Sequence, residues 1–188
     1  MLLEHLFYSA AFAIMAGMGY RHFTGRDPSW IIIVCAWAPD IDHFLFPVAR
    51  RLLGVSLMVN SRPLDHGDLH TFAALIVFAV LLALFLRLPP FNVRLRDGLL
   101  FGALGYAVHL ACDIAVYNPA FPVFWPLYSK SVGLGLVHYS RDLFGLADSQ
   151  VLAAGILLLV CAVLLRTAMT GTDWIECYMP GRRPPGGA

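Results

Sequence analysis

The sequence contains little charge. Only 13% of its 188 residues are Asp, Glu, Lys or Arg, whereas 59% are hydrophobic and the mean hydropathy is +0.71. A soluble domain of this length cannot hide so much apolar surface, so the excess must face lipid. The formal net charge is only +1, and no run of Lys and Arg alternates with aromatic residues. Nucleic acid is therefore excluded as an electrostatically attracted partner.

The four cysteines include no CxxC pair, which argues against a redox or zinc-finger motif. Cys35, Cys112 and Cys161 lie within apolar segments, where a thiol behaves as a small hydrophobic group, and we interpret them as packing residues. A signal peptide is not expected either. Glu4 and His5 stand where Lys or Arg would precede the apolar stretch, so the first segment is predicted to remain as a helix.

Long apolar runs dominate the rest of the chain. A helix needs about 20 mostly apolar residues to cross roughly 30 Å of hydrocarbon. Hydropathy and turn-forming residues predict five such segments, at 3–20, 29–46, 69–86, 98–117 and 150–169. We expect an all-α polytopic transmembrane helix bundle forming a single membrane-embedded domain over residues 1–170. An interfacial loop is expected at 118–149, and the C-terminal tail at 171–188 is expected to be disordered at its end.

The basic residues are divided unequally between the two sides of this predicted bundle. One side carries Arg21, Arg26, Arg87, Arg94, Arg96, Arg166, Arg182 and Arg183, and the other carries Arg50, Arg51, Arg62, Lys130 and Arg141. The positive-inside rule assigns the larger set to the cytoplasm. The chain is then an integral protein of the cell inner (plasma) membrane, with its N-terminus outside.

Polar motifs interrupt the apolar segments at four points. They are His5, the run Pro39-Asp40-Ile41-Asp42-His43, the run His66-Gly67-Asp68-Leu69-His70, and the run His109-Leu110-Ala111-Cys112-Asp113. Alternating crossings place all four on the same side of the membrane, and the helix rise of 1.5 Å per residue puts them in the outer half of the bilayer. Each intramembrane ionisable group costs on the order of 3 kcal/mol, and bound metal ions would compensate this cost.

The residue types and spacing agree with metal binding. His66/His70 and His109/Asp113 are i,i+4 pairs, which share one face of a helix. Imidazole with carboxylate suits Zn, Mn or Fe, and a bridging Asp can hold two ions. We therefore predict one or two divalent metal ions, with Zn favoured. The predicted ligands are His5, Asp40, Asp42, His43, His66, His70, His109 and Asp113.

Each motif taken alone has another interpretation. His5 could cap a helix or lie at the interface, and Asp40 or Asp42 could cap a helix kinked after Pro39. His109 and Asp113 could make an interhelical hydrogen bond. Because all four motifs are predicted on the same side of the membrane and at similar depth, we favour a shared role in metal binding.

Four segments together resemble a known family. APDIDH at 38–43, HGDLHT at 66–71, HLACD at 109–113 and WPLYSKSVGLG at 125–135 are similar to the membrane-bound, metal-dependent hydrolases of the inner-membrane, LexA-regulated type. The family's usual His-Arg-Gly-x-Thr-His-Ser occurs here without its Arg and one residue shorter. More remotely, the order of ligands is similar to zinc-dependent phospholipase C and the single-strand-specific zinc nucleases. Those enzymes have a further His-x-x-x-Asp/Glu, a form that His138 to Asp142 shares.

The resemblance implies hydrolysis, most plausibly of a phosphoester in a lipid or lipid-linked substrate, through a metal-activated water. Asp68 would orient a histidine ligand, and Lys130, with Arg141, would orient phosphate oxygens. Two other functions remain open. They are a divalent metal transporter, whose site would lie near the midplane with access from both faces, and a structural or regulatory metal-binding membrane protein. The oligomeric state stays open.

Overall fold

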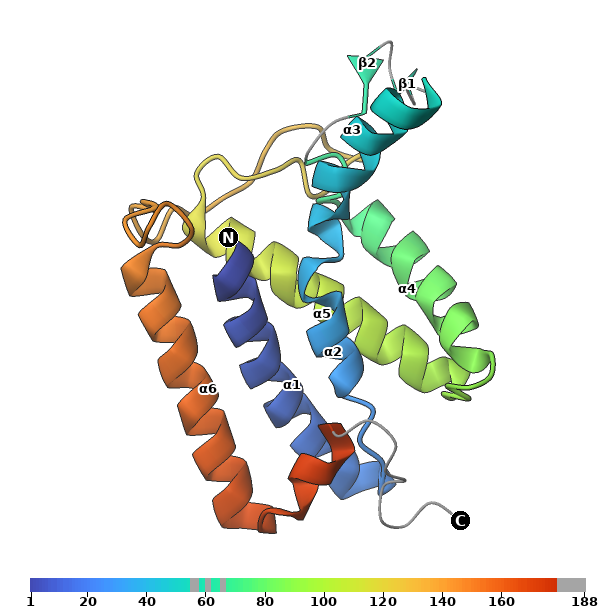
Figure 1. The fold of residues 1–188 in the computed structure, drawn as a ribbon, viewed down its shortest axis with the longest axis vertical. Helices are drawn as coiled ribbons and strands as arrows, with labels where there is room; N and C mark the ends of the chain where they lie inside the picture. Colours follow the sequence, from blue (N-terminus) through green and yellow to red (C-terminus); the bar gives the residue numbers. More distant parts are fainter. Residues whose placement is uncertain (55–57, 60–61, 65–66, 179–188) are drawn as a thin grey trace.

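A computed structural model of the chain describes residues 1–54, 58–59, 62–64 and 67–178, and these are predominantly helical (Figure 1). The long helices are α1 (Leu2–Thr24), α3 (Asp42–Leu53), α4 (Phe72–Arg87), α5 (Leu95–Val116) and α6 (Ser149–Thr170). The short elements are α2 (Trp30–Val34), the 3-10 helices η1 (Cys35–Trp37), η2 (Pro39–Ile41) and η3 (Asp173–Tyr178), and the antiparallel pair β1 (Met58–Val59) and β2 (Arg62–Pro63). The all-α prediction is confirmed apart from this two-residue ladder. The Pro/Gly-rich end of the predicted tail, 180–188, lies outside the described residues.

Within the described residues, three helical stretches are long and apolar enough to cross a membrane: Trp30–Leu52, Leu95–Val116 and Ser149–Thr170. The prediction of about five was therefore too high by this measure. Helix α4 has only 16 residues, which is about 24 Å at the helical rise of 1.5 Å per residue. Helix α1 has 23 residues, but Glu4 and His5 near its start and Arg21 and His22 near its end interrupt the apolar stretch.

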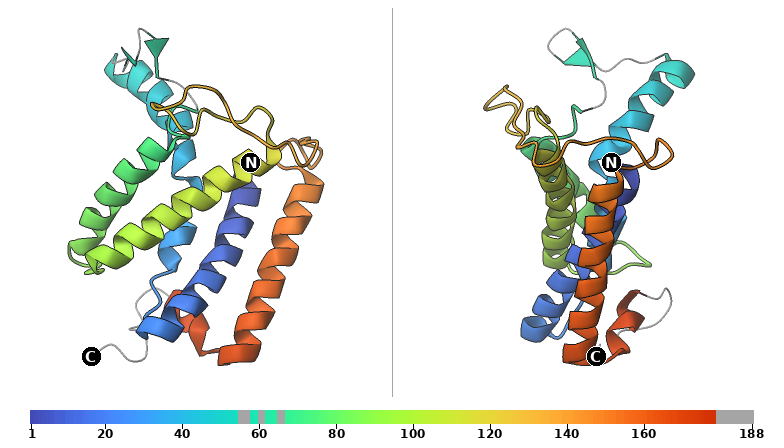
Figure 2. Two further views of the ribbon diagram at one scale, coloured as in Figure 1. Left: turned by 180° about the vertical axis from the view of Figure 1, so that it is seen from behind. Right: turned by 90° about the vertical axis from the view of Figure 1, so that its left-hand side faces the viewer.

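The second predicted segment is not one regular helix. Pro39 has no N–H, and its ring would clash with the carbonyl four residues earlier, so the regular α-helical hydrogen-bond ladder is interrupted there. The chain instead tightens into η1 and η2, where the Ala38 N–H donates to the Cys35 carbonyl over 3.0 Å. Helix α3 then continues beyond the bundle, away from the other long helices (Figure 2). This break in the helix determines where Asp40 lies in the bundle and which way its side chain points.

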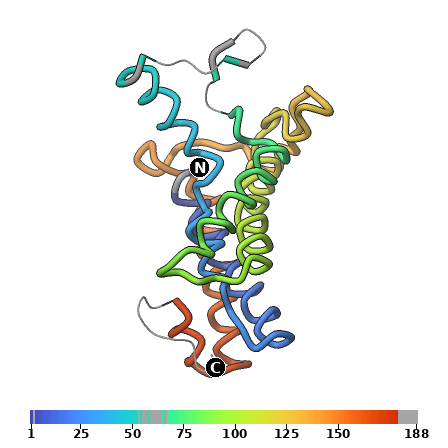
Figure 3. Tube along the Cα trace, turned by 90° about the vertical axis from the view of Figure 1, so that its right-hand side faces the viewer, coloured from blue at the N-terminus to red at the C-terminus, as the bar shows by residue number. Residues whose placement is uncertain are grey.

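A layer of apolar side chains lies midway along the bundle. Its buried members are Ala13, Ile31, Ile32, Cys35, Leu86 and Phe101. A side chain on Gly105 of α5 would place its Cβ 2.6 Å from the Cβ of Cys35 and 3.0 Å from the Cα of Ile32. Glycine is therefore required there, because it lets α5 approach the start of the broken helix. Figure 3 shows α2 and α5 side by side in the middle of the molecule.

The segment 117–148, which nearly coincides with the interfacial loop predicted at 118–149, crosses one end of the bundle (Figures 1 and 3). The N–H of Leu134 donates to the carbonyl of Ile114 over 2.7 Å, and the N–H of Leu136 donates to that of Ala115 over 2.8 Å. These bonds satisfy carbonyls in the last turn of α5 that have no partner within the helix. The loop is thus attached to the end of the bundle at which the predicted metal ligands lie.

Candidate metal centre

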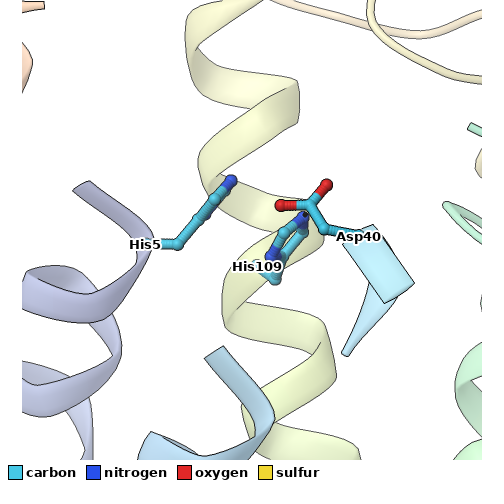
Figure 4. Close-up of side chains that lie close together, drawn as sticks. All are labelled: His5, Asp40 and His109. Carbon is cyan, nitrogen blue, oxygen red and sulfur yellow. Dashed lines mark ion pairs between the residues drawn. The ribbon is translucent and has the colours of Figure 1, made fainter. Parts of the chain in front are cut away.

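Five of the eight predicted ligands lie together at the end of the bundle covered by segment 117–148. His5 is in the second turn of α1, Asp40 is in η2, and His70 is in the turn that precedes α4. His109 and Asp113 occupy successive turns of α5. Figure 4 shows His5, Asp40 and His109 directed toward one another from three separate elements. Residues distant in the sequence therefore share one small volume.

Three ligand atoms form an almost equilateral triangle. His109 Nε2 lies 3.3 Å from His70 Nε2 and 3.3 Å from Asp113 Oδ2, and His70 Nε2 lies 3.4 Å from Asp113 Oδ2. Donors bound at about 2.0–2.1 Å to a tetrahedral ion are separated from one another by roughly 3.3 Å. The triangle therefore has the dimensions of one face of a tetrahedral zinc coordination shell.

The remaining two residues extend this arrangement. Asp40 Oδ1 lies 3.3 Å from His70 Nε2 and 3.7 Å from His109 Nε2, so it adjoins two of the three atoms of the triangle. The second carboxylate oxygen of Asp113, Oδ1, is 3.3 Å from His5 Nε2. His5, Asp40 and His109 form another set of three donors within 4.8 Å of one another, as do His70, His109 and Asp113. The two sets share His109, and the Asp113 carboxylate reaches donors of both.

The backbone break after α2 orients His109. The Nδ1 atom of His109 is 2.8 Å from the carbonyl oxygen of Ala36, which lies in η1. Donation from Nδ1 to this carbonyl leaves the lone pair of Nε2 directed at the cluster, which is the tautomer that a metal ligand requires. The 3-10 turns caused by Pro39 thus supply both Asp40 and the acceptor that orients His109.

Asp42 acts on the turn that holds His70. Its Oδ2 accepts the backbone N–H groups of Gly67 over 2.9 Å and Leu69 over 3.3 Å, and it lies 3.7 Å from His70 Nδ1. Gly67 has φ +96°, which disfavours any side chain. The Tyr106 hydroxyl donates to the Leu69 carbonyl over 2.5 Å and holds the turn from α5. We therefore interpret Asp42 as a residue that holds the turn of His70 in place, and not as one of the metal ligands.

The centre is buried. His5, His70, His109 and Asp113 are at most 3% exposed, while the Asp40 side chain retains 19%. Within the described residues, His5 Nδ1 is buried without a hydrogen-bond partner. A buried imidazole with one unsatisfied nitrogen is destabilising unless another interaction compensates it. The donor set itself fits a divalent ion.

A cavity of about 250 Å³ opens beside the cluster. His5, Asp40, His70 and Asp113 reach it, together with Tyr117 and Arg141 from segment 117–148 and its start. A phenol and a guanidinium are therefore available to a molecule that enters the cavity. Of the two predicted cations, Arg141 lines the cavity, whereas Lys130 is exposed on the loop.

The other predicted residues lie elsewhere. His43 is exposed, with its ring against Phe44, and Asp68 is half-buried in the turn that contains Gly67. His66 lies outside the described residues. The prediction that His66 and His70 share a helix face was wrong for His70, because α4 begins at Phe72 after the Thr71 cap.

The additional motif His138 to Asp142 is not part of the cluster either. His138 lines a neighbouring cavity of about 370 Å³ with Tyr117 and Tyr139. Asp142 accepts the N–H of Ser149 over 2.7 Å and its hydroxyl over 2.6 Å at the start of α6. Its carboxylate therefore satisfies hydrogen-bond donors at the first residue of α6.

Sequence reasoning missed Glu4. This residue is fully buried, and its Oε1 accepts the Tyr139 hydroxyl over 3.0 Å and the Asp148 N–H over 2.9 Å. It attaches segment 117–148 to the start of α1, one residue from His5. An ionisable side chain in an apolar helix was the available signal, because such groups are functional by default.

The fold and this cluster define a class: an integral membrane protein of several helices with a buried His/Asp centre at one end. Residues 1–173 match the family model described as YdjM inner membrane protein, and the chain belongs to this family. Its location is thus the inner membrane. Searches of curated proteins and of solved structures found no match.

Proposed function

We propose that this chain is a membrane-embedded, metal-dependent hydrolase, most specifically a phosphoesterase that acts on a lipid or lipid-linked substrate. The observation that carries the proposal is the triangle of His70, His109 and Asp113 ligand atoms with edges of 3.3–3.4 Å. The adjoining cavity supplies space for a substrate beside this donor set. A metal site that only held the helices together would not need such a cavity.

A bound divalent ion would supply Lewis acidity, which activates water at neutral pH and polarises a phosphoryl group. In the overall reaction, the oxygen of water bonds to phosphorus, the ester P–O bond breaks, and the leaving alcohol takes up the proton that water lost. The chain's own residues position these groups. Arg141 is placed to hold phosphate oxygens, and Tyr117 lines the same cavity.

We infer that α1 and α4 complete a bundle of five crossings and that the centre opens toward the extracytoplasmic side. The cluster, the start of α1 and the end of α5 lie at the same end of the molecule, and Arg21 and Arg26 lie at the other (Figure 1). The positive-inside rule favours a cytoplasmic position for the end with more Arg.

A polar path through the bundle would support transport, and the described residues favour hydrolysis instead. Below the centre, α5 presents Phe101 and the broken helix presents Ile31 and Ile32, all at most 1% exposed within the apolar layer. Along α5, the Tyr106 hydroxyl is bonded to the Leu69 carbonyl beside the centre. The next polar side chain comes at the other end of the helix, where Asp97 accepts from Tyr20 over 2.7 Å and pairs with Arg26 over 3.2 Å. An ion would have to cross this layer without ligands.

The test uses detergent-purified protein prepared without chelator. Metal content is measured by mass spectrometry, and hydrolysis is measured against a phospholipid panel by release of phosphorylated headgroup or diacylglycerol. Wild type is compared with Asp113→Asn and His109→Gln, and His43→Gln serves as an exposed-histidine control. We expect bound metal and hydrolysis in wild type and in the control, and loss of both in the two centre variants. Absence of metal in wild type, or unchanged cleavage in both centre variants, would refute the proposal.

A further inference from the structure

A second, larger cavity lies on the membrane-spanning part of the bundle. It is a groove of about 680 Å³ between α1, α5 and α6, and its walls are almost wholly apolar. Tyr8 and Phe12 of α1 line one side, and the small residues Ala111 of α5 and Ala154 of α6 leave space opposite them. Its long axis follows the two apolar helices, so the groove faces the hydrocarbon of the bilayer.

The dimensions of the groove suit a single hydrocarbon chain. The lining residues of α6 run from Gln150 to Leu165, which is about 22 Å at the helical rise. One leaflet of the hydrocarbon core is about 15 Å thick, so an acyl chain of one leaflet can lie entirely within the groove. The volume divided by this length gives a cross-section of roughly 30 Å².

One end of the groove meets the candidate metal centre. Met1 lines both the groove and the polar cavity that His5, Asp113 and Arg141 reach. On α5, Val116 lines the groove and the next residue, Tyr117, lines the polar cavity. An amphiphile therefore matches the two compartments in order, with an apolar chain in the groove and an anionic headgroup beside Arg141 and the donor set.

We propose that the groove holds one acyl chain of a membrane glycerophospholipid, whose phosphate then lies in the polar cavity beside the centre. The inference rests on the proposed function for the choice of a phosphoester, and it specifies the substrate class as a lipid that remains partly in the bilayer. The acyl chain held in the groove determines where the headgroup lies, so the groove contributes to substrate binding. The centre acts on the chemical step.

The probe is a phosphatidylethanolamine that carries a photoactivatable diazirine midway along one acyl chain. It is mixed into vesicles of phosphatidylethanolamine and phosphatidylglycerol that contain the full-length protein. After illumination, peptide mass spectrometry locates the cross-links. We compare wild type with Ala154→Trp, which fills the groove, and with Ala153→Trp. Ala153 is the adjacent exposed residue of α6 and does not line the groove, so it is the matched control.

We expect wild-type cross-links concentrated on groove residues of α5 and α6. We expect at least about a fivefold lower yield in Ala154→Trp and an unchanged yield in Ala153→Trp. Hydrolysis by Ala154→Trp should show a raised KM with metal content unchanged. The proposal is overturned by cross-links spread evenly over the exposed faces of α6, by equal yields in both Trp variants, or by cross-links confined to residues outside the groove.

The variant Asp113→Asn separates this inference from the proposed function. Its groove is intact, so the acyl cross-links should persist although the donor set is incomplete. Groove cross-links in a wild-type protein that cleaves no lipid would support the groove and refute the hydrolase. Lipid cleavage without groove cross-links would support the hydrolase and refute the groove.

Discussion

At the scale of single residues, the cluster depends on groups that orient its histidines. His109 is aligned by the Ala36 carbonyl over 2.8 Å, and the turn that contains His70 is held by the Asp42 carboxylate through the N–H groups of Gly67 and Leu69. Such supporting groups matter because an imidazole that rotates freely loses affinity for its metal. Asp42 is fully buried, so its carboxylate has no competing contact with solvent.

The substitution Asp42→Asn tests this support. It keeps the shape of the side chain but removes the charge that holds two N–H donors and faces His70. We expect metal affinity to fall by about 10- to 100-fold, while the helical content is retained. The measurement is competition for zinc against a chromogenic chelator, with circular dichroism of the same samples.

The matched control for this experiment is Asp142→Asn. Asp142 also accepts a backbone N–H, that of Ser149, but it serves the start of α6. Equal losses of zinc affinity in the two variants, or no loss in Asp42→Asn, would contradict the supporting role of Asp42.

At the scale of elements, segment 117–148 is attached to the helix ends by buried carboxylates. Asp148 caps α6 by accepting the N–H groups of Gln150 and Val151, each over 3.0 Å, and its other oxygen accepts the Ser140 N–H over 2.7 Å. Glu4 of α1 accepts the N–H of Asp148 itself. The cover of the centre and the starts of two helices therefore form one hydrogen-bonded unit.

This unit should loosen in acid. The Ser140 N–H, followed by that of Val151, holds the pKa of Asp148 below its ordinary value. A carboxyl whose folded pKa is depressed stabilises the fold above its unfolded pKa of about 3.9, and this contribution is lost as the pH falls through the folded pKa. We expect faster hydrogen exchange at Ser140 and Val151, after correction for intrinsic rates, as the pH is lowered from about 5 to 3.

The variant Asp148→Asn is the control for acid loosening. It should show faster exchange at these two amides already at neutral pH and little further change in acid. Asp142 titrates in the same direction because Ser149 lowers its pKa, so the readout is restricted to the amides bound by Asp148. A wild-type exchange rate independent of pH would contradict the assignment.

At the scale of the whole molecule, polar networks at opposite ends are separated by the apolar layer. At the end opposite the His/Asp cluster, the guanidinium of Arg166 on α6 contacts Asp27 and donates to the Ile14 carbonyl of α1 over 3.2 Å. It also lies 4.9 Å from the ring of Trp174 in η3. This network joins α6, α1, the connector before α2 and η3, so it fixes how the helices are arranged at that end.

Breaking this network should destabilise the entire bundle. The Arg166 and Asp27 side chains are each 1% exposed, so removing one leaves the other charge buried and unpaired. We expect Arg166→Met to lower the free energy of unfolding in bicelles by about 3–5 kcal/mol. The double variant Arg166→Met with Asp27→Asn should lose less than the sum of the two single losses. Additive losses would show that the two side chains are not coupled.

The orientation of the whole molecule can be tested with introduced cysteines. Leu127→Cys lies on segment 117–148 at the end that carries the centre, and Phe91→Cys lies between α4 and α5 at the other end. With the centre outside, a membrane-impermeant maleimide should label Leu127→Cys in cells whose inner membrane is intact, and Phe91→Cys only after that membrane is permeabilised. The parent chain with its native cysteines sets the background, and the reverse pattern would place the centre in the cytoplasm.

The sequence alone determined the class of the molecule. Its apolar runs required a helical membrane protein, and the i,i+4 spacing of His109 and Asp113 placed both on one face of α5, where they lie 3.3 Å apart. Local periodicity was sufficient for these results, because a helix repeats every 3.6 residues whatever surrounds it. It was not sufficient for His70, which precedes the Thr71 cap instead of lying on a helix.

Only the tertiary structure decided which polar residues act together. Asp40 and Asp42 are two residues apart, yet one faces the ligands and the other supports a turn, because the 3-10 segment around Pro39 sets their directions. Contacts such as Ala36 with His109 and Glu4 with Asp148 join residues 73 and 144 positions apart. Such pairings depend on how the helices pack, and packing is a property of the assembled bundle that no local repeat encodes.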